Sequence, residues 1–322
     1  MSALNTIVVR RIRKKDFAQF MSVVRRAFSE EIEIVGLDLQ RFSPVVRFFN
    51  LVDPLSRVLD TIGVYLPTIL VAVSQDDVIV GGVHIAPFGN GVWTIDSLAV
   101  DPNYRRLGIG VRLISEAVKY VWNGRGERAL TYVRSDNVPS LSIRRRLRGE
   151  FFDRRVLLLS ELNETSTAKD TGGFSIREVK SEDVLQILQL CNKLDPKKAA
   201  TFRITAGNFQ YSLLEHLLGK LRLSFSKRLT LKAEDKIVGY IHLTCTSPEE
   251  AGRIESFYVI GDSDLHYRTT VLLNRAFQIL HERNIKKVTV SLSQDWKEMR
   301  QILENIGFKP YASFYGVAHN LA

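Results

Sequence analysis

The chain contains only two cysteines among 322 residues, Cys191 and Cys245, and no spacing motif pairs them. Two cysteines are too few to cross-link a chain of this length, which excludes a disulfide-dependent fold and favours a reducing compartment. Long apolar runs are missing as well: the longest are short and interrupted by proline, and charge appears early, at Arg10 to Lys15. This pattern indicates neither a membrane span nor a secretion signal, so we expect a cytoplasmic protein without a membrane partner.

Three familiar ligand signatures are absent too. The six histidines show no metal-ligand spacing. His84 and His242, which occupy matched strand positions, are therefore interpreted as core residues, and we expect no metal ion. The glycine-containing loop at residues 105–110 lacks the third glycine of a Rossmann fingerprint and the Gly-Lys-Ser/Thr of a Walker loop.

The most informative segment runs from Thr94 to Gly110. Residues 94–100 (TIDSLAV) have the pattern of a buried strand that ends at Asp101 and Pro102, and beyond Gly110 apolar residues recur at helical spacing. Between the two lies loop 105–110, with the sequence RRLGIG. Free N–H groups at a helix start bind anions, and glycine lets the backbone approach a pyrophosphate. The segment therefore predicts a site for a phosphate-bearing ligand.

Loop 105–110 resembles the Arg/Gln-x-x-Gly-x-Gly/Ala loop of the GNAT superfamily of acyl-CoA-dependent N-acyltransferases, with Arg105, Gly108 and Gly110 at the defining positions. The resemblance includes the preceding strand, which ends in Leu-Ala-Val, and continues through the strand 129–135 to Asn137. It implies that acetyl-CoA is the acyl donor. The residues implied to contact it are Leu98, Ala99, Val100, Arg105, Arg106, Leu107, Gly108, Ile109, Gly110 and Asn137.

The same plan occurs twice along the chain. Residues 94–100 match residues 253–259 at an offset of 159, which holds into the next helix and at the end of the following strand. A repeat of this length indicates duplicated domains. We expect an α/β fold of two tandem GNAT-like domains, each a mixed twisted sheet flanked by helices. The predicted domains are residues 1–160 and 174–322, joined by a polar linker at 161–173.

The second copy lacks the phosphate-binding features. At the offset of 159, the three defining loop residues Arg105, Gly108 and Gly110 are replaced by Asp264, Tyr267 and Thr269. Side chains crowd this loop, and a carboxylate stands where a phosphate needs a cation. We therefore interpret the second domain as a non-catalytic copy.

Asp96 is the candidate general base. The resemblance implies direct attack of an amine on the thioester of acetyl-CoA, and an alkylamine with a pKa near ~10 must lose a proton before it attacks. Asp96 lies on the strand that leads to loop 105–110, where some family members place a basic side chain. Alternatively, Asp96 caps or orients a neighbouring loop, which the recurrence of a carboxylate at Glu255 slightly favours. Backbone amides around Leu98 to Val100 are implied to bind the thioester oxygen.

The family's usual general acid is missing. Many members place a tyrosine seven residues beyond the asparagine that Asn137 resembles, but this position is Arg144 here and Leu303 in the second copy. Tyr132, Ser140 or water are the alternative proton donors. The departure leaves a second class of protein open, namely an acyl-CoA-binding sensor or regulatory module of GNAT fold.

Positive charge is concentrated in the first half of a chain whose net charge is +10. Six arginines cluster near the end of the predicted first domain: Arg144, Arg145, Arg146, Arg148, Arg154 and Arg155. The cluster is either a solvated helix face or a surface that attracts CoA phosphates, an acidic substrate or nucleic acid. Nucleic acid is the least favoured partner, because no aromatic residue for base stacking is interleaved with the arginines of residues 144–148.

The segment 35–67 either covers the acceptor site as a lid or packs as apolar helices. Together these patterns predict a cytoplasmic tandem GNAT protein whose first domain transfers an acetyl group from acetyl-CoA to a primary amine. They identify neither the amine acceptor nor the oligomeric state.

Overall fold

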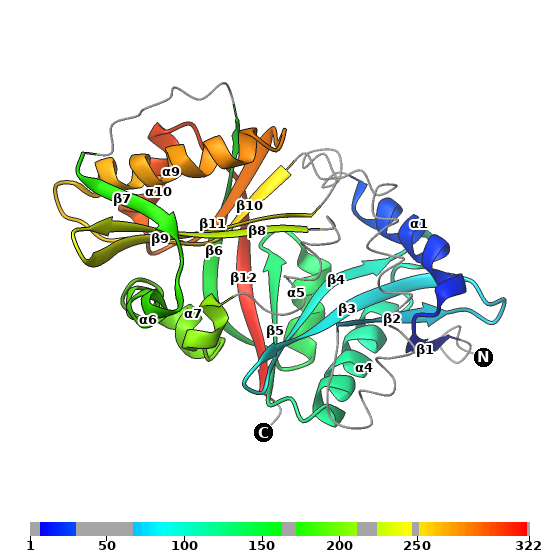
Figure 1. The fold of residues 1–322 in the computed structure, drawn as a ribbon. Coiled ribbons are helices and arrows are strands. Elements are labelled where there is room, and N and C mark those ends of the chain that lie inside the picture. The colour runs from blue at the N-terminus through cyan, green and yellow to red at the C-terminus, as the bar shows by residue number, and fades with distance from the viewer. Residues whose placement is uncertain (1–6, 30–66, 163–171, 211–223, 247–250, 321–322) are drawn as a thin grey trace. The chain divides into compact units, whose positions relative to one another are not determined.

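The computed structural model describes residues 7–29, 67–162, 172–210, 224–246 and 251–320. The chain divides into two compact units (Figure 1). Unit 1 holds the described residues up to Phe152 and those from Tyr315 onward, and unit 2 holds the described residues from Asp153 to Phe314. Each unit is a mixed sheet flanked by helices, which confirms the predicted fold class.

Unit 1 has helices on both faces of its sheet. Its main elements are β1 (Val8–Arg11), α1 (Phe17–Ala27), β2 (Thr68–Val73), β3 (Ile79–Gly89), β4 (Val92–Val100), α4 (Ile109–Asn123), β5 (Arg128–Arg134) and α5 (Val138–Arg146). Strands β1 to β4 pair antiparallel in order, and β4 pairs with β5 in parallel. A side chain at Gly81 would meet Leu113 of α4, whereas one at Gly82 would meet Phe20 of α1. Since neighbouring strand residues point to opposite faces, α1 and α4 cover opposite faces of the sheet (Figure 1).

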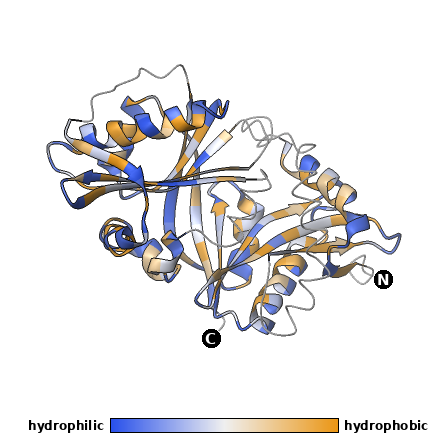
Figure 2. Ribbon diagram, in the orientation of Figure 1, coloured by the Kyte–Doolittle hydropathy of each residue, from blue (hydrophilic) through white to orange (hydrophobic). Residues whose placement is uncertain are grey.

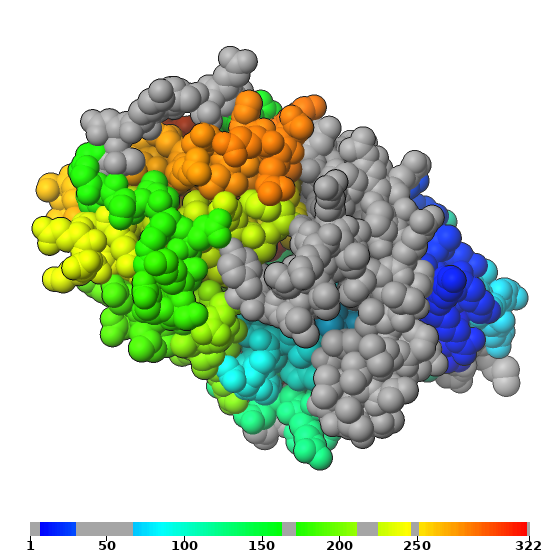
Figure 3. Space-filling model, in the orientation of Figure 1, coloured from blue at the N-terminus to red at the C-terminus, as the bar shows by residue number. Residues whose placement is uncertain are grey.

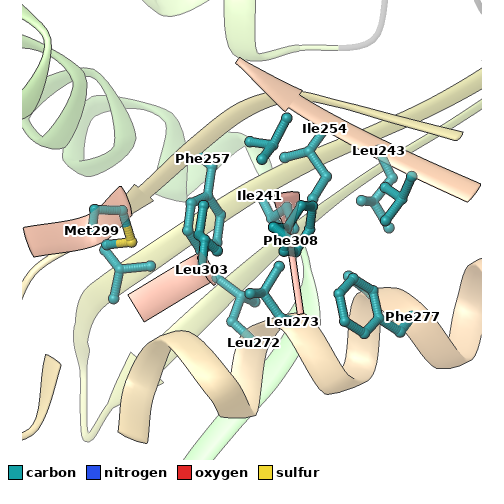
Figure 4. Packing of buried hydrophobic residues seen from close by; sticks show 14 of the residues in the cluster. Ile241, Leu243, Ile254, Phe257, Leu272, Leu273, Phe277, Met299, Leu303 and Phe308 are labelled. Carbon is teal, nitrogen blue, oxygen red and sulfur yellow. The ribbon is translucent and has the colours of Figure 1, made fainter. Parts of the chain in front are cut away.

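Unit 2 repeats this architecture. Its main elements are most of β6 (Glu150–Glu161), β7 (Phe174–Glu178), α6 (Val184–Leu194), α7 (Pro196–Thr201), β8 (Ser224–Ala233), β9 (Lys236–Thr246), β10 (Ala251–Val259), α9 (Leu265–His281), β11 (Lys287–Ser293), α10 (Lys297–Asn305) and the first half of β12 (Lys309–Asn320). One core lies between the sheet and helices α9 and α10, where Ile241 and Phe257 pack against Leu272 and Leu303 (Figure 4). A second core, on the α6 and α7 side, contains Tyr240.

Helices α4 and α9 show why the two halves fold alike. The fully buried residues Leu113 and Ala117 of α4 correspond to Leu272 and Ala276 of α9 at the offset of 159. Residues four positions apart share one helix face, so each helix presents an apolar stripe to its sheet. Both helices carry hydrophobic and hydrophilic residues in turn (Figure 2), and the outer face of α9 lies on the surface of unit 2 (Figure 3).

The predicted repeat is visible element by element. The pairs β4 and β10, β5 and β11, α5 and α10, and β6 and β12 have equal lengths and start 159 residues apart. Helices α1 and α6 also have equal lengths and start 167 residues apart. The matched openings make the same ion pair in both halves, Arg10 with Asp16 and Arg177 with Asp183.

The last strand of each repeat extends into the unit of the other repeat, β6 with nine of its twelve residues and β12 with six of twelve. Strand β6 pairs antiparallel with β11 over residues 155–161, so it completes the sheet of unit 2. Strand β12 lies next to β5, and its residues from Tyr315 onward belong to unit 1, where Val317 is fully buried with Val133 and Leu141. The compact units are divided at Phe152/Asp153 and again at Phe314/Tyr315. The assignment of repeats to 1–160 and 174–322 stays a prediction, and residues 163–171 of the predicted linker lie outside the described residues.

A chain truncated after residue 160 is expected not to form a stable unit 1. Removal of β12 exposes the hydrogen-bonding edge of β5 and strips Val317 from the core around Val133 and Leu141. We expect aggregation or loss of the cooperative thermal transition, measured by circular dichroism and size-exclusion chromatography. A synthetic peptide of residues 309–320 is expected to restore folding. A monomeric 1–160 chain with a sharp transition and no peptide would contradict the strand exchange.

Candidate active site

Strands β4 and β5 separate part-way along their length. Their parallel pairing ends at Thr94 and Leu130, so Asp96 and Thr131 lie just beyond the last pair. On its other side β4 is irregular against β3: Asp96 lies opposite His84 and Ala99 opposite Gly82, which leaves two residues of β4 facing one of β3. Such a bulge takes backbone groups out of the regular ladder. Leu98 belongs to this bulge, and Ala99 and Val100 pair again with Gly82 and Gly81, so a role of Leu98 to Val100 towards the thioester stays a prediction.

The left-handed backbone of Ser97 produces this bulge. Its φ is +53°, a conformation that non-glycine residues adopt only where the surrounding structure holds it. In the second copy, the extra residue of β10 is Glu255, which lies between the pairs Ile254–Leu243 and Ser256–His242. Neither Glu255 nor Ser256 has a positive φ. The two halves therefore differ in the backbone at the point where the resemblance implies thioester binding.

Loop 105–110 has the geometry expected of an anion site. Gly108 is the N-cap of α4 at φ +74°, and no side chain caps this helix start. The loop residues Arg105, Arg106, Leu107 and Gly108 are exposed, whereas Ile109 and Gly110 are buried. The first N–H groups of α4 thus have no intrahelical acceptor and lie beside an exposed arginine.

Gly110 is needed for packing as well. A Cβ at this position would lie 2.9 Å from Cδ1 of Ile143, so helix α5 approaches the first turn of α4 at closest range here. Asp101 fixes the entry to the loop, since its carboxylate accepts from the Asn103 N–H at 3.0 Å and from Nε of Arg26 at 3.0 Å. These contacts hold loop 105–110 between strand β4 and helix α5.

Asp96 lies half-buried at the separation of β4 and β5. Burial raises its pKa above the ordinary value, although a hydrogen bond with Thr94 and the positive fields of His84 and Arg144 oppose the rise. Burial also lowers the pKa of His84, against the attraction of Asp96. A carboxylate with a raised pKa takes up a proton more readily near neutral pH, which is what a general base requires. His84, expected to be a core residue, is a direct neighbour of Asp96, and only the strand register could have revealed this.

Arg144 is a buried cation. Its side chain reaches from α5 to β5, where Nη2 donates to Oγ1 of Thr131 at 3.4 Å, and the residue is only 2% exposed. Its Nε and Nη1 atoms have no hydrogen-bond partner. Burial lowers the pKa of Arg144 to about 10, against the favourable field of Asp96. The position where the family places a tyrosine therefore holds a guanidinium with two unused donors.

His319 of β12 is the other titratable neighbour of Arg144. It is 4% exposed, and its Nε2 atom has no hydrogen-bond partner. Burial, and then repulsion by Arg144, lower the pKa of His319 to about 4, although a hydrogen bond to the backbone of Leu147 opposes the shift. His319 is therefore neutral in the folded chain at physiological pH.

The free energy of unfolding is expected to fall as the pH drops from 6.5 to about 4. In this window the unfolded chain binds a proton at His319 and the folded chain does not, so the loss reaches about 3 kcal/mol. A His319→Gln variant cannot titrate, so it is expected to show a shallower loss than the parent in urea unfolding at several pH values. Parallel curves for the two proteins would contradict a buried neutral histidine.

Three further predicted residues have structural contacts. Asn137 is the N-cap of α5 and its Oδ1 accepts from the Ser140 N–H at 3.0 Å, so its role towards CoA stays a prediction. Tyr132 packs against Phe152 with ring centroids 5.9 Å apart. Tyr132 and Ser140 therefore remain alternatives as proton donors.

The second copy has no counterpart to loop 105–110. Helix α9 begins at Leu265, which corresponds to Arg106, so helical residues replace the loop. Tyr267, at the position of Gly108, is 41% exposed and packs on Phe174 with ring centroids 6.1 Å apart. Arg268 binds Asp264 and donates to the Ile260 carbonyl at 2.7 Å. The predicted loss of the phosphate-binding features thus extends to the backbone.

The arginine cluster is not one surface. Arg145, Arg146, Arg148 and Arg154 are exposed, but Arg144 is buried in unit 1 and Arg155 in unit 2. Arg155 donates to Asp153 at 3.0 Å and to Asp195 at 2.9 Å. The expectation of a single solvated or ligand-attracting face is therefore wrong for these two residues, because strand and helix packing carries them inward.

Within the described ranges, no group of three or more metal-ligating side chains gathers in one place. No described helix is long and apolar enough to cross a membrane. Cys191 and Cys245 are not joined by a disulfide. The segment 35–67, predicted as a lid or as packing helices, lies outside the described residues except for its last member, Pro67.

Residues 49–149 match the profile of the acetyltransferase (GNAT) family. A GCN5-related N-acetyltransferase from Sphaerobacter thermophilus has the same fold at 14% identity, with 98% of this chain and 95% of that chain covered and a TM-score of 0.64. A tandem GNAT protein from the clavulanic acid biosynthesis pathway aligns at 14% identity, 98% and 99% coverage and a TM-score of 0.65. A putative acetyltransferase from Pyrococcus horikoshii aligns at 12% identity, 98% and 90% coverage and a TM-score of 0.63.

No curated protein matches the sequence. The fold, with its repeated sheet and helices, is that of a tandem GNAT protein. Residues 49–149 belong to the GNAT family itself, whose members are acyltransferases, generally N-acetyltransferases.

Proposed function

We propose that the chain is an N-acetyltransferase whose unit 1 binds acetyl-CoA and transfers the acetyl group to a primary amine by direct attack. One contrast carries the proposal: unit 1 combines an uncapped helix start at Gly108, a strand bulge with left-handed backbone at Ser97 and a carboxylate of raised pKa. Unit 2 has a helix in place of the loop. The residues proposed to hold the CoA pyrophosphate are Arg105, Arg106, Leu107, Gly108, Ile109 and Gly110, with Asn137 nearby.

In the proposed reaction Asp96 takes the proton of the amine, directly or through water. The amine nitrogen then bonds to the thioester carbon and loses its second proton to solvent water, and the backbone amides of Leu98 to Val100 stabilise the negative charge on the carbonyl oxygen. The C–S bond breaks, its electron pair stays on sulfur, and CoA leaves as a thiolate. The lack of a disulfide between the two cysteines supports a reducing compartment, and we propose a cytoplasmic location on that ground.

The alternative function is a GNAT-fold sensor that binds acyl-CoA without transfer, which the missing family tyrosine at Arg144 favours. Thiol release from acetyl-CoA, measured against a panel of primary amines, separates the two. Amine-dependent thiol release with a matching acetylated product supports the transferase. Binding of acetyl-CoA with no product from any amine supports the sensor.

A further inference from the structure

The buried guanidinium of Arg144 has no anion of its own. No ion pair of Arg144 occurs among the described residues, and the carboxylate of Asp96 acts on it only through the electrostatic field. Its Nε and Nη1 donors are unpartnered although the residue is 2% exposed. A charge taken out of water is costly unless an anion and hydrogen bonds compensate it, and such groups gather at functional sites.

The fold itself does not require a cation at this position. In unit 2 the matched residue is Leu303, which is fully buried in the core with Phe257 and Leu272 (Figure 4). The residue matched to Thr131 is Val290, which is also buried in that core. The polar pair Arg144–Thr131 therefore occurs in unit 1, which contains loop 105–110, and its counterpart in unit 2 is the apolar pair Leu303–Val290.

The location of Arg144 in unit 1 indicates which part of a bound acyl-CoA its side chain would contact. Its neighbour Ile143 packs against Gly110 in the first turn of α4, and its own Nη2 reaches Thr131, one residue beyond the last β4–β5 pair. Asp96 lies at the same separation on the other strand. In the proposed complex, an acyl-CoA held by the start of α4 with its thioester near Asp96 has its sulfur on the side of the β4–β5 separation where Arg144 lies.

We propose that Arg144 is a catalytic residue that stabilises the departing CoA thiolate by charge-assisted hydrogen bonds from its unused N–H groups. The inference rests on the proposed acyl-CoA site. When the C–S bond breaks, the electron pair remains on sulfur; the nitrogen has given its first proton to Asp96 before the attack and gives its second to solvent water. Arg144 donates hydrogen bonds and keeps its proton, because its pKa of about 10 lies above that of a thiol, near ~8.5. Arg144 thus stabilises the leaving thiolate with a fixed positive charge, whereas a general acid would protonate it.

The test compares calorimetric binding of CoA and of desulfo-CoA, which lacks the sulfur, to the full chain between pH 6.5 and 9.5. Asp96 from β4 and His319 from β12 also face Arg144. The pKa of His319, about 4, keeps it neutral over this pH range, and repeating the comparison in Asp96→Asn removes the titration of Asp96. We expect the preference for CoA to grow about tenfold as the thiol ionises, equivalent to one pKa unit. Arg144→Leu introduces the side chain that unit 2 already holds at Leu303. It is expected to abolish this growth without changing desulfo-CoA affinity, and Arg144→Lys is expected to retain part of it.

Arg145→Leu is the matched control, because Arg145 carries the same charge on the same helix and is exposed. Equal affinities for CoA and desulfo-CoA at every pH would overturn the inference and leave the CoA site intact. A preference that survives in Arg144→Leu would also overturn it, as would an acceptor KM that rises in this variant with kcat unchanged. Failure of both ligands to bind would overturn the proposed function itself.

Discussion

Replacing Asp96 with asparagine is expected to lower kcat by about 10²–10⁴-fold and to leave the affinity for CoA nearly unchanged. Asparagine keeps the size of the side chain and its contact with Thr94 but cannot accept the amine proton. The loss belongs to the transfer step, so kcat and kcat/KM for the amine are expected to fall together. Steady-state kinetics of thiol release measure both, once an amine acceptor is in hand.

The pH dependence separates a base from a structural carboxylate. Activity of the parent protein is expected to rise as the pH passes the raised pKa of Asp96, because only the deprotonated form accepts a proton. The Asp96→Asn variant is expected to recover at high pH, where more of the amine is already free. Glu255→Gln, at the matched position of unit 2, is the control and is expected to leave the rate unchanged. If Asp96→Asn keeps the full rate at neutral pH, Asp96 is not the general base, and water or the substrate accepts the proton instead.

A Gly108→Glu variant is expected to lose CoA affinity by about 100-fold or more. The residue stands at φ +74° as the N-cap of α4, so a side chain there is strained and its carboxylate lies beside the proposed pyrophosphate. Arg105→Glu is expected to act in the same direction with less strain, because Arg105 is exposed and lies in the loop. Isothermal calorimetry with CoA measures both variants.

Two controls separate charge from backbone strain and from location. Gly108→Asn introduces a residue that tolerates a positive φ and carries no charge, so we expect only a small loss of CoA affinity. Tyr267→Glu places the same carboxylate at the matched position of unit 2 and is expected to leave CoA affinity unchanged. If the Gly108→Glu protein is folded and binds CoA with normal affinity, loop 105–110 is not the pyrophosphate site.

Local patterns predicted the parts of the site that local forces determine. Loop 105–110 and the start of α4 follow from glycine, arginine and the change of hydrophobic period, and the second copy follows from a constant offset. The exchange of strands could not be predicted. Strands β6 and β12 have equal lengths at matched positions, so their patterns do not tell which unit each one completes.

The burial of charged and titratable side chains could not be predicted from the sequence either. The run of arginines around Arg144 has the composition of a solvated helix face, and only the packing of α5 on β5 turns Arg144 inward while Arg145 stays exposed. His84 has the sequence pattern of an isolated core histidine, and only the β3–β4 register places it opposite Asp96. Both cases depend on which strands and helices meet, and that information is distributed over the whole fold.

We propose that unit 1 binds one acyl-CoA and unit 2 binds none. Calorimetric titration of the full chain with CoA tests it most directly, since the stoichiometry counts the sites without any knowledge of the amine acceptor. We expect one CoA per chain, with binding abolished by Gly108→Glu and retained in Tyr267→Glu. Two CoA molecules per chain, or a single one that survives Gly108→Glu and is lost in Tyr267→Glu, would contradict it.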